Sequence, residues 1–316
     1  MAIETAQRLT IQGRKQLQAD GVVGIRRPVH IQAEIVRSAE QALLSTEAAS
    51  SFSSSSSSSS ITKLVHFQRH GQGFHNTICE IWKELAGKPV NLMSHDPTEN
   101  PMKRPEVLDA PLTEVGRQQC RARQGQAALL NPEMIIVSPL LRTLQTAELS
   151  WAAHSNRNNH NDDGNHKQNG NNINSSNNNN NEKNKMIPWI AHEGCREDLG
   201  VLICNQRQPV SHIQAVYPHV DFSLLTTDHD TLFLPHRHET ALEKANRIYD
   251  FLLFLRDLPV AELAVVTHSS WLFCMCNAVL DMKEDDDDAS SWFLTSEIRS
   301  LRVTFTDFVE GVEEEG

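Results

Sequence analysis

Short apolar runs alternate with longer segments of helical spacing along most of the chain. Strands are predicted for the runs ITKLVHF, EMIIVS, MIPWIAHEG and ELAVVTH, and a half-buried strand for the alternating run EIRSLRVTFTDF. Helices are predicted for HNTICEIWKELAG, LTEVGRQQCRARQGQAALL, PLLRTLQTAELSWA, HETALEKANRIYDFLLFLRDL and SSWLFCMCNAVL. Repeated strand and helix units predict an α/β sandwich with a mainly parallel sheet, in which ligands lie at the carboxyl ends of strands.

Three residues predict where helices begin or end. Gly87 is expected to end the first of these helices. Thr113 is the N-cap candidate of the second helix, because its side-chain oxygen can accept from a free backbone N–H. Pro139 is expected near the first turn of the third helix, where its missing N–H is tolerated.

Two low-complexity segments interrupt this pattern and predict the domain organisation. Residues 1–60 are predicted to be an N-terminal extension, weakly helical up to about residue 48, that ends in a poly-Ser linker. Residues 155–185 are Asn-rich without periodicity, which favours a disordered surface insertion over a metal site. Such an insertion costs a fold little, because loop-closure entropy grows only logarithmically with length. The main folded domain is therefore predicted to span residues 61–310, interrupted by the Asn-rich insertion.

Charge and composition narrow the classes of ligand. The 316 residues are 39% hydrophobic, enough for one sizeable core or two modest ones, and carry a formal net charge of −11. This acidic balance argues against general binding to nucleic acids or to membrane surfaces, because no basic face is available to them. An anionic ligand must therefore be held by a local cluster of Arg and His.

The six cysteines form no CxxC pair and no Cys/His spacing typical of zinc sites, so neither a metal nor another cofactor is expected. Reduced, mostly buried thiols fit an intracellular protein, and a cytoplasmic location is expected. Organellar targeting stays an open alternative, although Glu4, Asp20 and Glu34 interrupt the N-terminal segment. No apolar run reaches the roughly 18 residues that a membrane-spanning helix needs.

The candidate chemistry follows three of the predicted strands. The stretch FQRHG contains Arg69 and His70, VSPLLR contains Arg142, and VVTHSS contains His268. Each of these residues therefore lies at or just after the end of a different predicted strand. Guanidinium groups match phosphate oxygens bidentately, and neutral imidazole is an adequate nucleophile near pH 7. His70 is therefore predicted to attack phosphorus, while Arg69, Arg142 and His268 stabilise charge on the phosphoryl oxygens.

The leaving alkoxide needs a proton. The candidate donor is Glu197 in the stretch GCREDLG, which follows the strand predicted after the Asn-rich segment. Glu193 is its main competitor, because it lies only four positions earlier.

Taken together, these stretches resemble the histidine phosphatase superfamily, in its phosphoglycerate mutase-like branch. The resemblance rests on RHGQGFHN, DAPLTEVGRQQC, SPLLRTLQTA, REDLG, HRHETALEKANRIYDFLLFL and VVTHSSWLF, and covers roughly residues 62–152 and 186–308. It implies a three-layer α/β/α fold and a phosphohistidine intermediate. It also implies these roles: His70 as nucleophile, Arg69 and Arg142 as phosphate-binding arginines, His268 as second histidine, Glu197 as acid/base, and Asn76 as the asparagine of the nucleophile loop.

One part of the motif differs from true mutases, which typically follow Arg-His-Gly with Glu-Ser or Glu-Thr and then Trp-Asn. This chain has Gln72, Gly73, Phe74, His75 and Asn76 instead, as in plant, algal and fungal phosphoglycerate mutase-like proteins. The resemblance therefore implies a metal-independent phosphatase of the histidine acid phosphatase type. A phosphoglycerate mutase and a catalytically silent phosphate-binding protein are the alternatives. His75 either contacts the ligand or caps the following helix.

The expected substrate is a phosphorylated small molecule, with a phosphoprotein as the open alternative. Selectivity is expected in the segments that cover the site, KPVNLMSHDPTENPMKRPEV and NQRQPVSHIQAVYPHVDFSLL. Lys103, Arg104 and Arg207 in these segments are candidates for contact with an anionic substrate tail. The sequence leaves the oligomeric state open.

Overall fold

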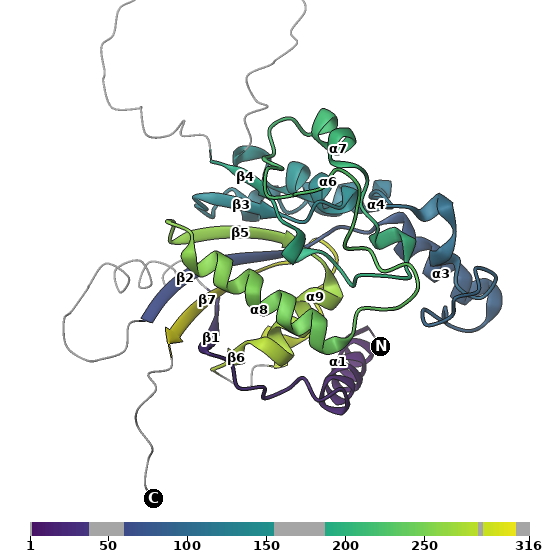
Figure 1. The fold of residues 1–316 in the computed structure, drawn as a ribbon, viewed down its shortest axis with the longest axis horizontal. Helices are drawn as coiled ribbons and strands as arrows, with labels where there is room; N and C mark the ends of the chain where they lie inside the picture. Colours follow the sequence, from purple (N-terminus) through teal and green to yellow (C-terminus); the bar gives the residue numbers. More distant parts are fainter. Residues whose placement is uncertain (1, 38–59, 155–186, 284–286, 308–316) are drawn as a thin grey trace, which may run out of the picture.

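The computed structural model describes residues 2–37, 60–154, 187–283 and 287–307 (Figure 1). These residues form a seven-stranded sheet with the strand order β4-β3-β5-β2-β7-β1-β6. The strands are β1 (Val29–Val36), β2 (Ser60–Arg69), β3 (Met134–Val137), β4 (Trp189–Ala191), β5 (Glu262–Thr267), β6 (Asp281–Met282) and β7 (Ile298–Asp307). Only β7 runs antiparallel to its neighbours, so the predicted mainly parallel sheet is confirmed.

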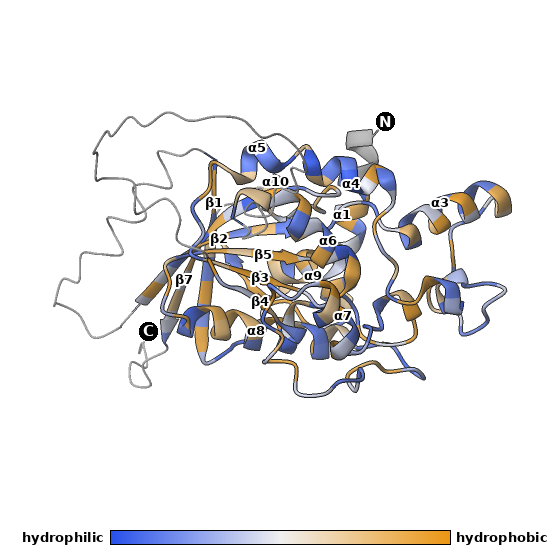
Figure 2. Ribbon diagram, turned by 90° about the horizontal axis from the view of Figure 1, so that it is seen from above, coloured by the Kyte–Doolittle hydropathy of each residue, from blue (hydrophilic) through white to orange (hydrophobic). Residues whose placement is uncertain are grey.

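Helices cover both faces of the sheet, which confirms the predicted three-layer α/β/α sandwich. One face packs against α1 (Ala2–Ala19), α8 (Ala241–Asp257), α9 (Ser269–Cys274) and the π-helical turn η7 (Met275–Val279). The other face packs against α5 (Gln124–Ala127) and α6 (Leu141–Ser150), and α4 (Glu114–Arg121) lies on α6. Hydrophobic strands lie between these layers, whose outer sides are largely hydrophilic (Figure 2).

The remaining helices are short or lie at the ends of the sheet. Figures 1 and 2 show α3 (Phe74–Ala86) beyond the end of the sheet, away from the two helical layers. The others are α7 (Val210–Val216), α10 (Asp287–Ser290) and the 3-10 turns Pro101–Lys103, Pro105–Val107, Ala152–His154, Glu193–Cys195 and Ile203–Asn205.

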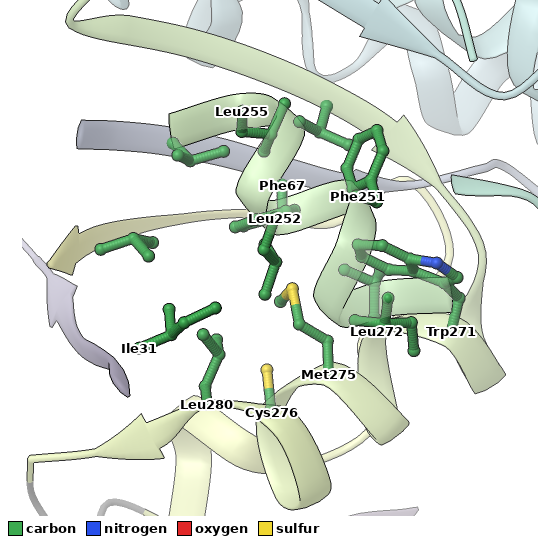
Figure 3. Packing of buried hydrophobic residues seen from close by; sticks show 14 of the residues in the cluster. Ile31, Phe67, Phe251, Leu252, Leu255, Trp271, Leu272, Met275, Cys276 and Leu280 are labelled. Carbon is green, nitrogen blue, oxygen red and sulfur yellow. The ribbon is translucent and has the colours of Figure 1, made fainter. Parts of the chain in front are cut away.

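Alternation along β5 explains why its sequence is apolar throughout. Leu263 and Val265 point into the core under α8 and α9, whereas Ala264 and Val266 point into the core under α6. A strand buried on both faces has no polar side, so it appears in the sequence as an unbroken apolar run. On the first face, Phe67, Phe251 and Trp271 pack closely with side chains of η7 (Figure 3).

Most predicted elements are present, with two corrections. Residues 29–36, expected to be weakly helical, form β1, because Val29, Ile31 and Ala33 alternate with more exposed residues and face the core. The predicted extension thus adds a strand to the sheet. The helix predicted from residue 112 is divided into α4 and α5. Pro139 directly precedes Leu140, the N-cap of α6, and so lies near the first turn as expected.

The predicted caps at Gly87 and Thr113 are confirmed. Gly87 ends α3 in the left-handed conformation with a φ of 64°, which glycine adopts without a Cβ clash. Thr113 Oγ1 accepts from the Gly116 N–H at 3.0 Å and starts α4. The Asn-rich segment 155–185 and the poly-Ser stretch lie outside the described residues, apart from Ser60, and the predicted domain boundaries stay predictions.

Candidate active site

The predicted site residues meet at the carboxyl ends of three neighbouring strands. His70 directly follows β2, and His268 directly follows β5, its parallel neighbour. The His70 N–H donates to the Thr267 carbonyl at 3.0 Å, which ties the two strand ends together. The rings of His70 and His268 consequently lie 5.2 Å apart between centroids.

The hydrogen bond of His70 determines which of its nitrogens can react. His70 is 1% exposed, and its Nδ1 lies 2.6 Å from the Gly71 carbonyl oxygen. Because a carbonyl oxygen only accepts, Nδ1 carries the proton and Nε2 has a free lone pair. No described residue forms a hydrogen bond with Nε2, so this nitrogen is available to a substrate.

His268 is oriented by a residue that follows the third strand. Its Nε2 lies 2.8 Å from Ser138 Oγ, directly after β3, which pairs with β5. Its Nδ1 is buried and finds no hydrogen-bond partner among the described residues. A buried polar atom without a partner is costly unless a ligand supplies one.

Arg142 lies in the first turn of α6 and is fully buried. Its terminal nitrogens donate to the Cys204 carbonyl at 2.7 Å and to Asn205 Oδ1 at 2.8 Å. Arg69 donates to the Phe293 carbonyl at 2.7 Å. Within the described residues, neither guanidinium has a carboxylate at ion-pair distance. Two positive charges thus lie beside His70 without a directly paired anion.

Asp109 fixes the helix that carries Arg142. Its Oδ1 accepts from the Leu141 N–H at 2.9 Å and its Oδ2 from the Gln208 N–H at 3.3 Å. Burial raises the pKa of this carboxyl to about 6, although the two N–H groups and Arg142 oppose the rise. Asp109 also adopts a φ of 44°, a conformation that a non-glycine residue keeps only when its surroundings impose it.

Three histidines of the site are held in the neutral form. Burial, followed by the positive charge of Arg142, lowers the pKa values of His70, His75 and His268 well below the ordinary range. A neutral imidazole keeps its lone pair, so His70 stays nucleophilic at neutral and moderately acidic pH.

His75 lies beside His70 and does not cap α3, while its contact with a ligand stays a prediction. Gly73 is the N-cap of α3, and Asn76 Oδ1 accepts from the Gly73 N–H at 2.9 Å. This bond leaves the amide NH₂ of Asn76 for another acceptor. The His75 ring lies 5.5 Å from the His70 ring, and its buried Nδ1 has no partner among the described residues.

The two candidate glutamates have different surroundings. Glu197 Oε2 accepts from the Ser270 N–H at 3.2 Å and Oε1 from the Trp271 N–H at 3.1 Å, at the start of α9. Burial, and then the adjacent Asp198, raise the pKa of Glu197. Glu193 is instead bound by Arg196 at 2.9 Å and by Arg207 at 2.7 Å. Glu193 is therefore a structural ion-pair residue, and Glu197 is the candidate proton donor.

Comparison with known proteins now decides the family. Residues 92–164 match the histidine phosphatase superfamily (branch 1). Phosphoglycerate mutase-like protein 1 of Arabidopsis thaliana is 34% identical over 247 residues, which are 76% of this chain and 81% of the relative. The chain belongs to the histidine phosphatase superfamily. The phosphoglycerate mutase-like branch expected from the motifs is thereby confirmed, and members of this superfamily are enzymes of the phosphatase or mutase type.

One further relative and one solved structure extend the comparison. Another A. thaliana protein, named Phosphoglycerate mutase-like protein, is 32% identical over 214 residues, which are 66% of this chain and 72% of the relative. Among solved structures, mycobacterial hydrolase 1 is 17% identical with a TM-score of 0.40, and the match covers 76% of this chain and 92% of that chain.

Arg207 is not the substrate-contacting residue that the sequence suggested. It is 3% exposed, its Nε donates to Glu193, and its terminal nitrogens donate to the carbonyls of Gln208, Thr227 and Asp228. Its donors are thus used within the histidine phosphatase fold. Contact of Lys103 or Arg104 with a substrate stays a prediction.

Sequence reasoning missed three residues that hold the site together: Asp109, Ser138 and Asn205. Asp109 and Ser138 lie inside stretches that the family resemblance uses, so the motifs were a usable signal. The described residues contain no group of three or more His, Cys, Asp or Glu placed to hold a metal ion. All six cysteines are free thiols, and the described helices include none long and apolar enough to cross a membrane.

Proposed function

We propose that the protein is a metal-independent phosphatase of the histidine acid phosphatase type, which hydrolyses phosphorylated small molecules through a phosphohistidine at His70. One observation carries this proposal. Arg69 and Arg142 donate to neutral oxygens and lack a carboxylate at ion-pair distance within the described residues, beside the free Nε2 of His70. A phosphate dianion would supply the missing negative charge.

In the first step, His70 Nε2 attacks phosphorus in line with the ester oxygen. The N–P bond forms while the P–O bond breaks, and the electron pair leaves on the alkoxide. Glu197 gives its proton to that oxygen, so the alcohol departs neutral. Arg69, Arg142 and His268 would stabilise charge on the phosphoryl oxygens, and the free amide of Asn76 and the ring of His75 are proposed to bind there as well.

In the second step, water attacks the phosphohistidine. The N–P bond breaks, its electron pair returns to Nε2, and the Glu197 carboxylate takes a proton from the water. Inorganic phosphate then leaves, with His70 neutral and Glu197 protonated again. The cycle therefore consumes one ester and one water and releases one alcohol and one phosphate.

A phosphoglycerate mutase is the second candidate, and the names of the plant relatives favour it. A mutase would pass the phosphoryl group to a sugar-acid hydroxyl instead of water. The stretch from Gln72 to Asn76 supports the hydrolase, because it departs from the mutase motif directly beside His70. A silent phosphate-binding protein is the third reading, but every residue that the mechanism needs is present.

One assay distinguishes the three activities. The protein is incubated with 3-phosphoglycerate, primed with the 2,3-bisphosphate, and separately with 4-nitrophenyl phosphate, and both inorganic phosphate and 2-phosphoglycerate are measured. Release of phosphate without 2-phosphoglycerate is expected. Predominant formation of 2-phosphoglycerate would contradict the proposal in favour of a mutase. Vanadate binding without turnover of a wide panel of esters would favour the binding protein.

A further inference from the structure

A second carboxylate, Asp198, lies directly after Glu197 and has its own set of partners. Lys244 Nζ on α8 donates to Asp198 Oδ1 at 2.6 Å. Ser270 Oγ on α9 lies 3.2 Å from the same oxygen, and Lys244 Nζ lies 2.8 Å from Ser270 Oγ. These three side chains form a closed ring of hydrogen bonds that joins α8 to α9.

Ser270 connects this ring to the candidate acid. Its side chain contacts Asp198, while its backbone N–H donates to Glu197 Oε2 at 3.2 Å. The Trp271 N–H donates to the other Glu197 oxygen, and Trp271 is itself buried, with its indole N–H bound to the Gly194 carbonyl at 2.8 Å. The two carboxyl groups are therefore held by the same fixed helix end.

The charges around the pair push the two carboxyls toward opposite protonation states. Burial and then Asp198 raise the pKa of Glu197, against the effects of Lys244 and Arg142. Burial also opposes ionisation of Asp198, but the charge and hydrogen bonds of Lys244 and Ser270 outweigh it and lower the pKa of Asp198. Groups facing the pair come from several elements: Lys244 and Arg247 of α8, His238 in the segment before α8, Arg142 of α6, Arg69 of β2, and the thiols of Cys204 and Cys274.

We propose that Asp198, held by Lys244 and Ser270, is a positioning residue that keeps the Glu197 carboxyl oriented and protonated, so that it can donate its proton to the leaving group. This inference rests on the proposed phosphatase function and adds a positioning residue for its proton donor. Neighbouring carboxyls with different surroundings are a general way to set one as acid and keep the other ionised. The Asp198 charge repels an anion at Glu197, so Glu197 holds its proton to higher pH.

The test compares three variants on two substrates. D198N removes the charge, D198E restores it, and D257N removes a carboxylate from the far end of α8, where Asp257 pairs with Arg256. Along a helix, Asp257 lies about 20 Å from Lys244, which is beyond the screening length of physiological salt. The substrates are an alkyl phosphate, whose leaving group needs a proton, and 4-nitrophenyl phosphate, whose phenolate leaves without one.

For D198N, the alkaline limb of kcat/KM for the alkyl ester is expected to move about one unit to lower pH, which is about tenfold in rate above that limb. The kcat/KM for 4-nitrophenyl phosphate is expected to change less than about twofold, because it reports the first step, in which the phenolate leaves without a proton. D198E is expected to return the alkaline limb toward the wild-type position, and D257N to leave it unchanged.

An unmoved alkaline limb in D198N, or an equal loss with both substrates and in D198E, would overturn the proposal. If D198N does not fold, ¹³C carboxyl NMR of the wild-type protein decides the question. Asp198 is expected to ionise at lower pH than Glu197, and the reverse order would overturn the proposal. Failure of the phosphatase function is distinguishable, because then the wild-type protein would hydrolyse neither substrate.

Discussion

His66 lies within β2 and His70 directly follows this strand, yet the surroundings of the two side chains differ. Each is 1% exposed. His66 Nδ1 lies 2.7 Å from Ser300 Oγ and its Nε2 lies 2.9 Å from Glu262 Oε1, so both ring nitrogens have protein partners. His70 has a partner for Nδ1 alone. Burial alone therefore does not distinguish the two histidines, whereas the open Nε2 of His70 does.

Two buried arginines repeat this contrast. Arg196 contacts the carboxylates of Asp230 at 2.6 Å and Glu193 at 2.9 Å, so its charge is paired. Arg142 donates to a carbonyl and an amide oxygen instead. Arg196 is thus paired with carboxylates of the fold, while Arg142 and Arg69 have no carboxylate at ion-pair distance among the described residues, and we propose that they bind the anionic ligand.

The largest expected effect is the difference in activity between the alanine variants of His70 and His66. H70A is expected to lower kcat by about 10³-fold or more, because the nucleophile is lost, with little change in melting temperature. H66A is expected to leave the activity of the folded protein within about twofold. Turnover of 4-nitrophenyl phosphate by purified H70A near the wild-type rate would contradict the assignment.

Substitution of Arg142 should mainly lower activity, whereas substitution of Arg196 should mainly lower stability. R142K is expected to lower kcat by about 10²-fold, because lysine loses the planar fork that contacts phosphoryl oxygens. R196A is expected to lower the free energy of unfolding by about 3–5 kcal/mol, because the buried Asp230 carboxylate loses its ion-pair partner and Glu193 keeps only Arg207. Steady-state kinetics and urea unfolding of both variants provide the measurements, and equal effects on activity would remove the contrast.

The paired histidine should matter for stability. H66A leaves Glu262 and Ser300 without their shared partner, and we expect the free energy of unfolding to fall by about 1–3 kcal/mol. Urea unfolding of H66A and wild-type protein measures this difference. Unchanged stability together with lost activity would place His66 in the catalytic machinery and contradict the comparison.

The smallest expected effect is on the pH dependence of stability. His70, His75 and His268 have lowered pKa values in the folded protein, so below about pH 6.5 the unfolded chain binds more protons than the folded one. Stability should therefore fall as the pH drops from about 7 to 5. Asp109, with its pKa raised to about 6, opposes this in part, because the folded protein binds its proton first.

H75Q tests this linkage, because it removes one of the three histidines. Its melting temperature is expected to drop less between about pH 7 and 5.5 than that of the wild-type protein. Thermal unfolding at the two pH values, in the same salt, measures the difference. An equally steep drop in both proteins would show that His75 is not held neutral by the fold.

The sequence predicted those features that depend on local pattern. Apolar runs followed by Arg or His located the strand ends, and parallel pairing of β2, β5 and β3 made the convergence of His70, His268 and Arg142 foreseeable. The strand at residues 29–36 was missed, although VHIQAEIV alternates, because it lies between a helix and a low-complexity segment.

The rest of the site depends on contacts between distant loops. Asn205 meets Arg142 across 63 positions of the chain, and no local pattern indicates such a contact. Glu193 and Glu197 could not be distinguished by spacing, because the decisive difference is the pairing of Glu193 with Arg196 and Arg207. The sequence therefore could not predict which partner each charged group has in the folded protein.

Trapping the intermediate tests the central claim most directly. The protein is mixed with a ³²P-labelled monoester, quenched within milliseconds in denaturant at alkaline pH, and the labelled residue is located by peptide mass spectrometry. An acid-labile, base-stable phosphohistidine at His70, absent from H70A, is the predicted result. Rapid turnover with no label, or label on another residue, would contradict the account.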